Sequence, residues 1–325
     1  MRKTINKISV IGRIYDVSNI AVKTVQDTTK SSYGTEYING TLDVATDEEC
    51  LNIVQVHFTY VTEKTKAGKV NSTFKVLKGI IEAPKTVLQA GKDAATCVKI
   101  DTALGLNDFY TQKNGEETLV SAKRIEGGFV TIINASAMPE EDQRSKFECD
   151  MLINGTRYVE KDEEKHIDED YLIVKGAVFD FRNAILPVEF VVKSKGGIKY
   201  FESLDASAKN MTFTKVWGNI KSANIVTKKE EESAFGEAIV KEYTRTVREW
   251  TITGTSKADS VYEIGDAEAG ITLDEIKEAL ANRDIYLADV KKRQDEYNAS
   301  KGTNSEVPFK KDNAAGAVNA GDFNF

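Results

Sequence analysis

The sequence predicts a mainly β protein with one or two small Greek-key barrels, a C-terminal helix and a disordered tail. Three observations indicate this fold class. Apolar residues alternate with period two over residues 5–62, residues 147–258 are again rich in strand-forming residues, and the period changes to a helical one at residues 271–299. With 325 residues, 41% of them hydrophobic, the chain is long enough to bury two cores of ordinary size.

The first predicted unit covers residues 1–146. Strands are expected in the runs "INKISVIGRIYDV", "EYINGTLDVAT" and "NIVQVHFTYVTE". A helix follows in "NSTFKVLKGIIEA", which stops before Pro84, and two further strands are expected in "ATCVKIDTALG" and "GGFVTIINASA". Three strands, a helix and two strands is the element order of the OB-fold, a five-stranded Greek-key barrel with its helix between the third and fourth strands.

The second predicted unit, residues 147–258, is strand-rich and is expected to form an OB-like barrel. The runs "ISVIGRIYD", "LIVKGAVFD" and "FTKVWGNIK" share a central glycine, Gly12, Gly176 and Gly218, with an aliphatic residue two places later. A glycine inside a strand often marks a bulge or bend, which small barrels need, so the match favours structural repetition, with chance similarity as the alternative. A hairpin is expected around Gly196 and Gly197.

Residues 259–300 form an acidic region with an amphipathic helix over 271–299. Thr272 and Glu275 have the spacing of a capping box, and Leu273, Ile276 and later apolar residues recur at helical intervals. The apolar stripe is expected to dock on the second barrel or on a neighbouring subunit. Residues 301–325 lack periodicity and are interpreted as a flexible tail with an aromatic tip.

The net charge of −7 is unevenly distributed. Residues 1–90 carry 12 Lys and Arg against 9 Asp and Glu, whereas residues 259–300 carry 5 against 11, so the N-terminal part is mildly basic. No apolar run reaches the roughly 18 residues that a membrane-spanning helix needs, and the N-terminus enters a strand pattern without a cleavage signal. We therefore expect a cytoplasmic protein that does not associate with membranes.

No catalytic or metal-binding motif is recognisable, so we expect no enzymatic activity, cofactor or metal. Cys50, Cys97 and Cys149 lack metal-ligand spacing and are interpreted as reduced, buried thiols. His57 and His166 lack a second ligand at zinc spacing, and the Gly-Lys pairs lack the other residues of a phosphate-binding loop. The acidic run "EKDEEKHIDED" is interpreted as a solvated loop, with a divalent-metal site as the alternative.

Polar and aromatic residues alternate with the predicted core residues and indicate a binding surface. Cations on such a surface follow phosphates, and aromatic rings stack on the bases of single-stranded nucleic acids. Partial burial of each ring beneath a loop is the alternative interpretation. The candidate DNA-binding residues are Arg13, Tyr15, Tyr37, Gln55, His57, Lys175, Phe179, Trp217, Lys221, Tyr243 and Arg245.

The opening "NKISVIGRI" and the last residues, "DFNF", together resemble a single-stranded DNA-binding protein of the bacterial and bacteriophage replication type. The opening "NKISVIGRI" is similar to that family's first strand, with its asparagine, alternating aliphatics and Gly-Arg pair. The last residues, "DFNF", are similar to its acidic tail tip with a terminal phenylalanine. The resemblance implies OB-folds that protect single-stranded DNA in replication, recombination and repair, and a tip, Asp322, Phe323 and Phe325, that recruits other replication or recombination proteins.

Two departures from that family shape the expectation. The chain is about twice as long as the common bacterial form, which favours a bacteriophage version with two barrels per chain. Such a protein would act in the host cytoplasm, and a homo-oligomer is compatible with the resemblance. The tail has only Asp322 near its tip. The rival hypotheses are a β-rich structural or assembly protein of a virion and a metal-dependent nuclease or polymerase accessory enzyme that uses the acidic loop.

Overall fold

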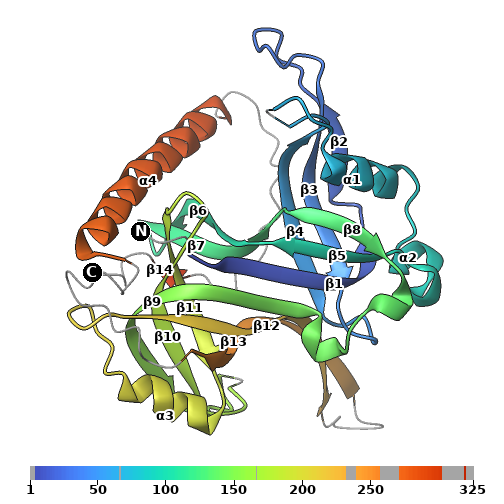
Figure 1. The fold of residues 1–325 in the computed structure, drawn as a ribbon. Helices are drawn as coiled ribbons and strands as arrows, with labels where there is room; N and C mark the ends of the chain where they lie inside the picture. Colours follow the sequence, from blue (N-terminus) through green and yellow to red (C-terminus); the bar gives the residue numbers. More distant parts are fainter. Residues whose placement is uncertain are drawn as a thin grey trace.

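The computed structural model describes residues 4–65, 67–165, 167–231, 239–256, 271–301 and 318–319, with the backbone alone described at 224–231, 239–245, 301 and 318–319. The protein is mainly β, with a long helix near its C-terminus, as the sequence predicts (Figure 1). Its strands form one continuous sheet that curls into two barrels. Among the described residues, no helix has both the length and the apolar character needed to cross a bilayer.

The first barrel closes through the pairings of an OB-fold. Antiparallel pairing joins β1 to β3, β3 to β4, β1 to β5 and β5 to β8, and the end of β7 runs parallel to β4. The sequence did not indicate β2, which pairs with β3, or the long β6–β7 hairpin. The strands are β1 (Asn6–Asp16), β2 (Ile20–Thr24), β3 (Glu36–Ala45), β4 (Ile53–Thr62), β5 (Cys97–Thr102), β6 (Leu104–Lys113), β7 (Glu116–Glu126) and β8 (Phe129–Ile133).

The helix α1 (Ser72–Glu82) lies between β4 and β5, where the OB-fold places it. The Asn71 side chain caps its N-terminus by accepting a hydrogen bond from the Thr73 backbone N–H at 3.1 Å. Phe74, Leu77 and Ile80 share its buried face, and the helix ends before Pro84 as predicted. The shorter helical segments are α2 (Val87–Ala90), η1 (Lys92–Ala94), η2 (Ala135–Ala137) and η3 (Glu141–Gln143).

The second barrel repeats this topology. β9 pairs with β10 and β12, β10 with β11, and β12 with β13, all antiparallel, while β11 and β13 are parallel where Val191 meets Thr251. A helix again lies between the third and fourth strands, which is the element order of an OB-fold. Its elements are β9 (Ser145–Val159), β10 (Tyr171–Phe179), β11 (Ile185–Val192), α3 (Lys195–Ser203), β12 (Thr212–Glu231) and β13 (Ile239–Thr255).

The hairpin predicted around Gly196 and Gly197 is wrong, because these residues lie in the first turn of α3. The Ser194 hydroxyl accepts a hydrogen bond from the Gly197 N–H at 3.2 Å and caps the helix. Phe201 is buried against the barrel, with Ile198 half-buried one turn earlier. A serine cap followed by apolar residues three positions apart therefore outweighs the turn tendency of the two glycines.

The two barrels are repeats in topology, but the shared glycine motif does not mark equivalent strands. Gly12 lies on the first strand of its barrel, whereas Gly176 and Gly218 lie on the second and fourth strands of the other. A Cβ atom at each position would meet a backbone carbonyl oxygen of the neighbouring strand at about 2 Å. The three glycines therefore share a close approach of strands rather than a common place in the fold.

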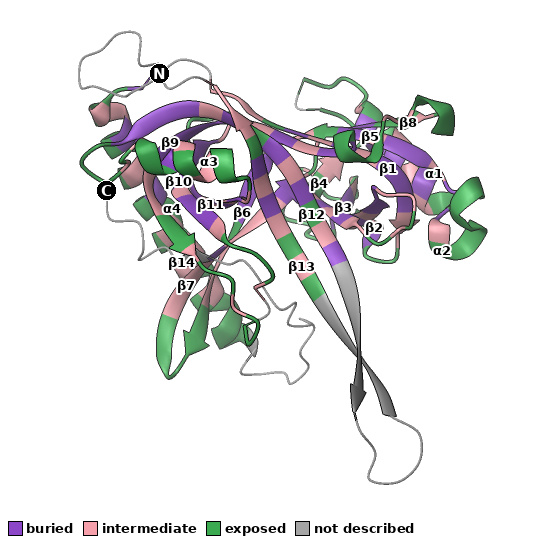
Figure 2. Ribbon diagram, turned by 90° about the horizontal axis from the view of Figure 1, so that it is seen from below, coloured by how far each residue is buried: buried purple, intermediate pink, exposed green. Residues whose placement is uncertain are grey.

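Direct strand pairing joins the barrels. Asn6–Val10 of β1 pairs with Ser145–Cys149 of β9, and Ile8 and Phe147, which face each other there, are buried in a core common to both barrels. Figure 2 shows buried residues along both of these strands. The Asn6 side chain also hydrogen-bonds to Leu104 of the first barrel and to the Phe179 carbonyl of the second. The barrels are thus held in one orientation.

Helix α4 (Leu273–Lys301) begins with the predicted capping box and docks on the second barrel. The Thr272 hydroxyl accepts from the Glu275 N–H, and the Glu275 carboxylate accepts from the Thr272 N–H at 2.8 Å. Ile276 and Ala279 are buried in a small core cluster with residues of the second barrel. The barrel residues of this cluster are Leu152, Ala177, Phe179, Ile185, Met211 and Phe213.

The remaining turns of α4 contact the β6–β7 hairpin of the first barrel. Arg283 forms a buried ion pair with Asp108, with 2.8 Å between Nη2 and Oδ1, and both groups contact the Ser121 hydroxyl. The Gln294 side chain donates to the Tyr110 carbonyl and accepts from the Tyr110 N–H. This side-chain amide therefore supplies hydrogen-bond partners to backbone groups at the edge of β6. Helix α4 therefore bridges the two barrels. Beyond it, β14 (Val318–Asn319) pairs with β7.

Glu48, in the turn between β3 and β4, holds two arginines at the joint between the barrels. Its carboxylate lies 2.7 Å from Arg144 Nη1 and 3.1 Å from Arg13 Nη1. The guanidinium of Arg144, and then that of Arg13, lowers the pKa of the Glu48 carboxyl to about 2.

The Glu48→Gln variant is expected to lower the free energy of unfolding at neutral pH by about 1–2 kcal/mol. This value is smaller than the pKa shift alone implies, because the Glu48 side chain is 38% exposed and solvent screens its ion pairs. Since the folded-state pKa lies below the ordinary 4.5, the contribution is complete above that pH and is lost as the pH falls toward 2. Denaturant unfolding at several pH values tests this. The variant and the parent should converge as the pH falls to about 2, and a constant difference between neutral pH and this point would contradict the assignment.

Candidate nucleic-acid interface

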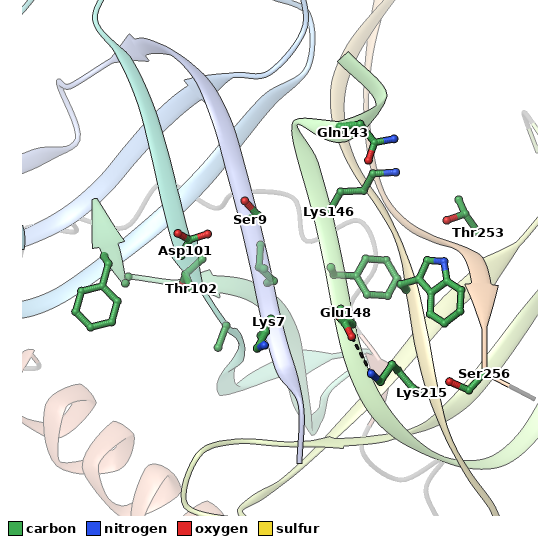
Figure 3. A pocket seen from close by; sticks show the side chains of 17 residues that line it. Lys7, Ser9, Asp101, Thr102, Gln143, Lys146, Glu148, Lys215, Thr253 and Ser256 are labelled. Atoms are coloured by element: carbon green, nitrogen blue, oxygen red, sulfur yellow. Dashed lines mark ion pairs between the residues drawn. The ribbon is translucent and has the colours of Figure 1, made fainter. Parts of the chain in front are cut away.

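An open groove of about 1200 Å³ crosses the joint between the barrels. β1, β5 and β8 form its wall on the first barrel, and β9, β12 and β13 form the wall on the second (Figure 3). Its lining combines lysines, hydroxyl groups, two carboxylates and three aromatic rings. The groove therefore offers both charge and stacking surfaces.

The register of the strands explains why these side chains share one face. Directly paired residues of neighbouring strands point to the same side of a sheet. Ser9 on β1 pairs with Asp101 on β5 and with Lys146 on β9, and Asp101 pairs in turn with Phe129 on β8. In the adjacent row, Lys7 pairs with Glu148, and Glu148 pairs with Trp217 on β12. These two rows run without interruption from one barrel into the other.

The cations of the groove fall into two groups. Lys215 lies 3.0 Å from the Glu148 carboxylate, with the ion pair drawn in Figure 3, and the other groove carboxylate, Asp101, lies 3.1 Å from Lys99. Lys7 is exposed and Lys146 is half-buried, and within the described part of the chain neither has an acidic partner at ion-pair distance. These two lysines flank the joint and are available to an anion.

Trp217 on β12 and Phe129 on β8 line the groove from opposite barrels. Trp217 is 40% exposed and Phe129 is 75% exposed, whereas the third ring, Phe147, is buried and stacks on Phe190 with 4.8 Å between the ring centroids. A Cβ atom on Gly254 would lie 2.4 Å from the Trp217 indole, so this glycine allows the ring to lie across β13. Each exposed ring offers an apolar face on which a planar ligand group can stack.

The candidate residues predicted on the first barrel lie outside the groove. Tyr15, Tyr37, Gln55 and His57 are half-buried on β1, β3 and β4, and Tyr37 contacts the Tyr60 ring at 4.7 Å between centroids. Gln55 donates to Asp43, and His57 Nδ1 lies 3.0 Å from the Thr41 hydroxyl.

The outward placement predicted for Arg13 is wrong. The residue is only 9% exposed, because the bulge between Ile14 and Asp16 and the neighbouring turn bring Glu48 to its guanidinium.

The candidates on the second barrel have mixed outcomes. Trp217 lines the groove and Lys221 is exposed on β12, whereas Lys175 is half-buried, 3.5 Å from Glu189. The outward placement of Phe179 is wrong, because the residue is fully buried beneath α4. The shared glycine motif equated Lys175 and Phe179 with residues on the first strand of the other barrel, whereas both lie on β10, the second strand of their own barrel. Tyr243 and Arg245 lie outside the described side chains, and the tip, Asp322, Phe323 and Phe325, lies outside the described residues.

Sequence reasoning missed Lys7, Phe129 and Lys146. Lys7 and Ser9 alternate with Ile8 and Val10 in the sequence, so the outward face of the first strand was recognisable. Phe129 directly follows the Gly127-Gly128 turn. What the sequence does not indicate is the pairing of β1 with β9, which brings these residues beside Lys146 and Trp217.

Comparison with known proteins places the chain in a family. The model of the YorF family matches residues 5–293, which include both barrels and most of α4. The chain belongs to the YorF family. No curated protein matches this YorF-family chain. A solved structure, a deletion mutant of the single-stranded DNA-binding protein from Thermus aquaticus, is similar over 82% of this chain and 100% of its own, with 10% identity and a TM-score of 0.44.

Proposed function

We propose that this protein binds single-stranded DNA, without sequence specificity, in the groove between its barrels. The observation that carries the proposal is the combination of Trp217 and Phe129, two exposed rings, with Lys7 and Lys146 between them. Proteins that bind single strands use rings that stack on unpaired bases and cations that follow the backbone. Every base has a stacking face, so such contacts do not read the sequence.

The overall charge of −7 does not oppose this function, because association depends on the local arrangement of charge. Both carboxylates in the groove are engaged by lysines, Asp101 by Lys99 and Glu148 by Lys215. The ammonium groups of Lys7 and Lys146 remain for phosphates. In duplex DNA the bases are already stacked on one another, so the two rings favour single strands.

Fluorescence titration with oligo-dT and with a duplex of equal length tests the proposal. We expect tighter binding of the single strand and an affinity that falls as the salt concentration rises, because each phosphate contact releases counterions. Equal affinity for single strand and duplex at low salt would exclude this function, and absence of binding to either would favour a structural role.

The Trp217→Ala variant is expected to weaken oligo-dT binding by about 1–3 kcal/mol while the protein stays folded, because the exposed indole stacks on a base. Phe181→Ala is a matched control, since Phe181 is 87% exposed and does not line the groove. Affinity is measured by anisotropy of a labelled oligonucleotide, and folding by thermal denaturation. Equal losses for the two variants would show that the binding surface lies elsewhere.

The wider role we propose follows from the resemblance of the chain ends. The protein protects single-stranded DNA during phage or bacterial replication, recombination and repair in the cytoplasm and has no catalytic activity of its own. The C-terminal tip, with Asp322, Phe323 and Phe325, recruits replication or recombination proteins. The apolar ring of Phe323 beside the Asp322 carboxylate suits a pocket that pairs an apolar slot with Arg or Lys.

Removal of residues 320–325 is expected to leave the melting temperature and the DNA affinity nearly unchanged and to abolish capture of these partners. The truncation keeps Val318 and Asn319, which pair with β7, so the described fold is intact. Pull-down from infected-cell extract with parent and truncated protein provides the measurement. Retention of every partner by the truncated protein would show that the tip has no recruiting role.

A further inference from the structure

The two ends of the groove belong to one continuous outer face rather than to two separate barrel surfaces. Phe129 on β8, Asp101 on β5, Ser9 on β1 and Lys146 on β9 form one row of directly paired residues. The adjacent row continues this face to Trp217 on β12. The row crosses the joint by backbone pairing, so the spacing of the two rings is fixed by the sheet.

We infer that the groove is a single site that holds one DNA strand across both barrels, with Phe129 and Trp217 as its two stacking anchors. Lys7 and Lys146, at the joint, contact the phosphates between the anchors. The inference rests on the proposed function and adds to it the number of strands bound, the path of the strand and the minimum length of DNA.

The length follows from the number of strands between the anchors. β8, β5, β1, β9 and β12 are consecutive neighbours, which gives four spacings of about 4.8 Å, or about 19 Å along the sheet. At the ~3.4 Å rise per nucleotide of a stacked strand, this distance corresponds to about six nucleotides. A stretched strand needs fewer, whereas an oligonucleotide of about three nucleotides reaches only one anchor.

The joint is rigid enough to act as the centre of a site. Ile8 and Phe147 face each other across it and are 2% and 3% exposed, and Asn6 ties the first barrel to the second through its side-chain amide. Because the anchors are already held at their spacing, the strand loses little affinity to ordering of the protein. The second anchor then acts at a high effective concentration once the first is occupied.

A length series of oligo-dT, titrated against the full-length chain, Phe129→Ala and Trp217→Ala, tests this inference. For strands of about ten nucleotides we expect one strand per chain and a loss of roughly 5- to 150-fold in affinity for either variant. For strands of about three nucleotides we expect weak binding at either anchor, and each variant should lose one of these two binding positions. The affinity of the parent should rise steeply at about six nucleotides, and this rise should disappear in both variants.

The outcomes separate the inference from the function on which it rests. Two ten-nucleotide strands per chain, or a loss with Trp217→Ala and none with Phe129→Ala, would overturn the single site while single-strand binding stands. Absence of binding at every length would overturn the proposed function. Phe181→Ala is the control for loss of an exposed ring, and each variant is compared at equal folded fraction, measured by thermal denaturation.

Discussion

Replacing Arg283 by methionine is expected to lower the free energy of unfolding by about 3–5 kcal/mol, because it leaves the buried carboxylate of Asp108 without its cation. The two side chains are 7% and 2% exposed, with 2.8 Å between Nη2 and Oδ1. The Ser121 hydroxyl still donates to Asp108, but a neutral donor does not replace a charged partner. Urea unfolding of the full chain, followed by circular dichroism, gives this free energy.

Two companion variants make the result specific. Lys292→Met, which alters an exposed ion pair with Glu296 on the same helix, is expected to leave stability unchanged. Asp108→Asn combined with Arg283→Met removes both charges and is expected to recover much of the loss, because no buried charge is left unpaired. A loss of less than about 1 kcal/mol for the single Arg283 variant would show that α4 is held by its apolar turns alone.

This ion pair matters to the groove because α4 fixes parts of both barrels. Its first turns pack on the second barrel through Ile276 and Ala279, and Arg283 and Gln294 hold the β6–β7 hairpin of the first. The direct β1–β9 pairing and α4 are therefore two separate restraints on the barrel orientation. Loss of one restraint is expected to loosen the hairpin before it opens the joint.

Local signals made much of the fold predictable. Helical spacing of apolar residues, together with Pro84 after the first helix and the capping box at Thr272 before the second, identified α1 and α4, because these signals lie within a few residues of each helix. The order of strands around α1 then identified the OB-fold. The β6–β7 hairpin was missed because its turn at Asn114 and Gly115 lies in a polar stretch without clear alternation.

The candidate site was only partly predictable because long-range pairing creates it. Trp217 was identified from its place beside a strand glycine, but Lys146 and Phe129 come beside it only through pairings of residues far apart in sequence. Alternation assigns a residue to a face, yet it does not say what covers that face. Helix α4 covers Phe179, and Glu48, from the turn between β3 and β4, forms an ion pair with Arg13. Both contacts involve residues far apart in the sequence, so a local pattern does not reveal them.

Gly218→Ala is expected to lower the free energy of unfolding by about 3 kcal/mol, because the added methyl group has no room between two paired strands. The added Cβ would lie 1.9 Å from the Thr251 carbonyl oxygen and 2.8 Å from the Phe147 ring. The first neighbour is backbone of the paired strand β13, so relief requires the strands to separate at the bulge between Trp217 and Gly218. Thermal and urea unfolding measure the loss.

Gly155→Ala is the matched control, because Gly155 lies on β9 and a Cβ there would meet nothing within 4 Å. It is expected to be neutral or slightly stabilising, since alanine restricts the unfolded chain. The bulge at Gly218 also sets the direction of Trp217, so any Gly218→Ala protein that remains folded should bind oligo-dT as weakly as Trp217→Ala. If Gly218→Ala kept the stability and the DNA affinity of the parent, β12 and β13 would have to move apart here at little cost. The close approach of these strands would then not be what holds the Trp217 indole in the groove.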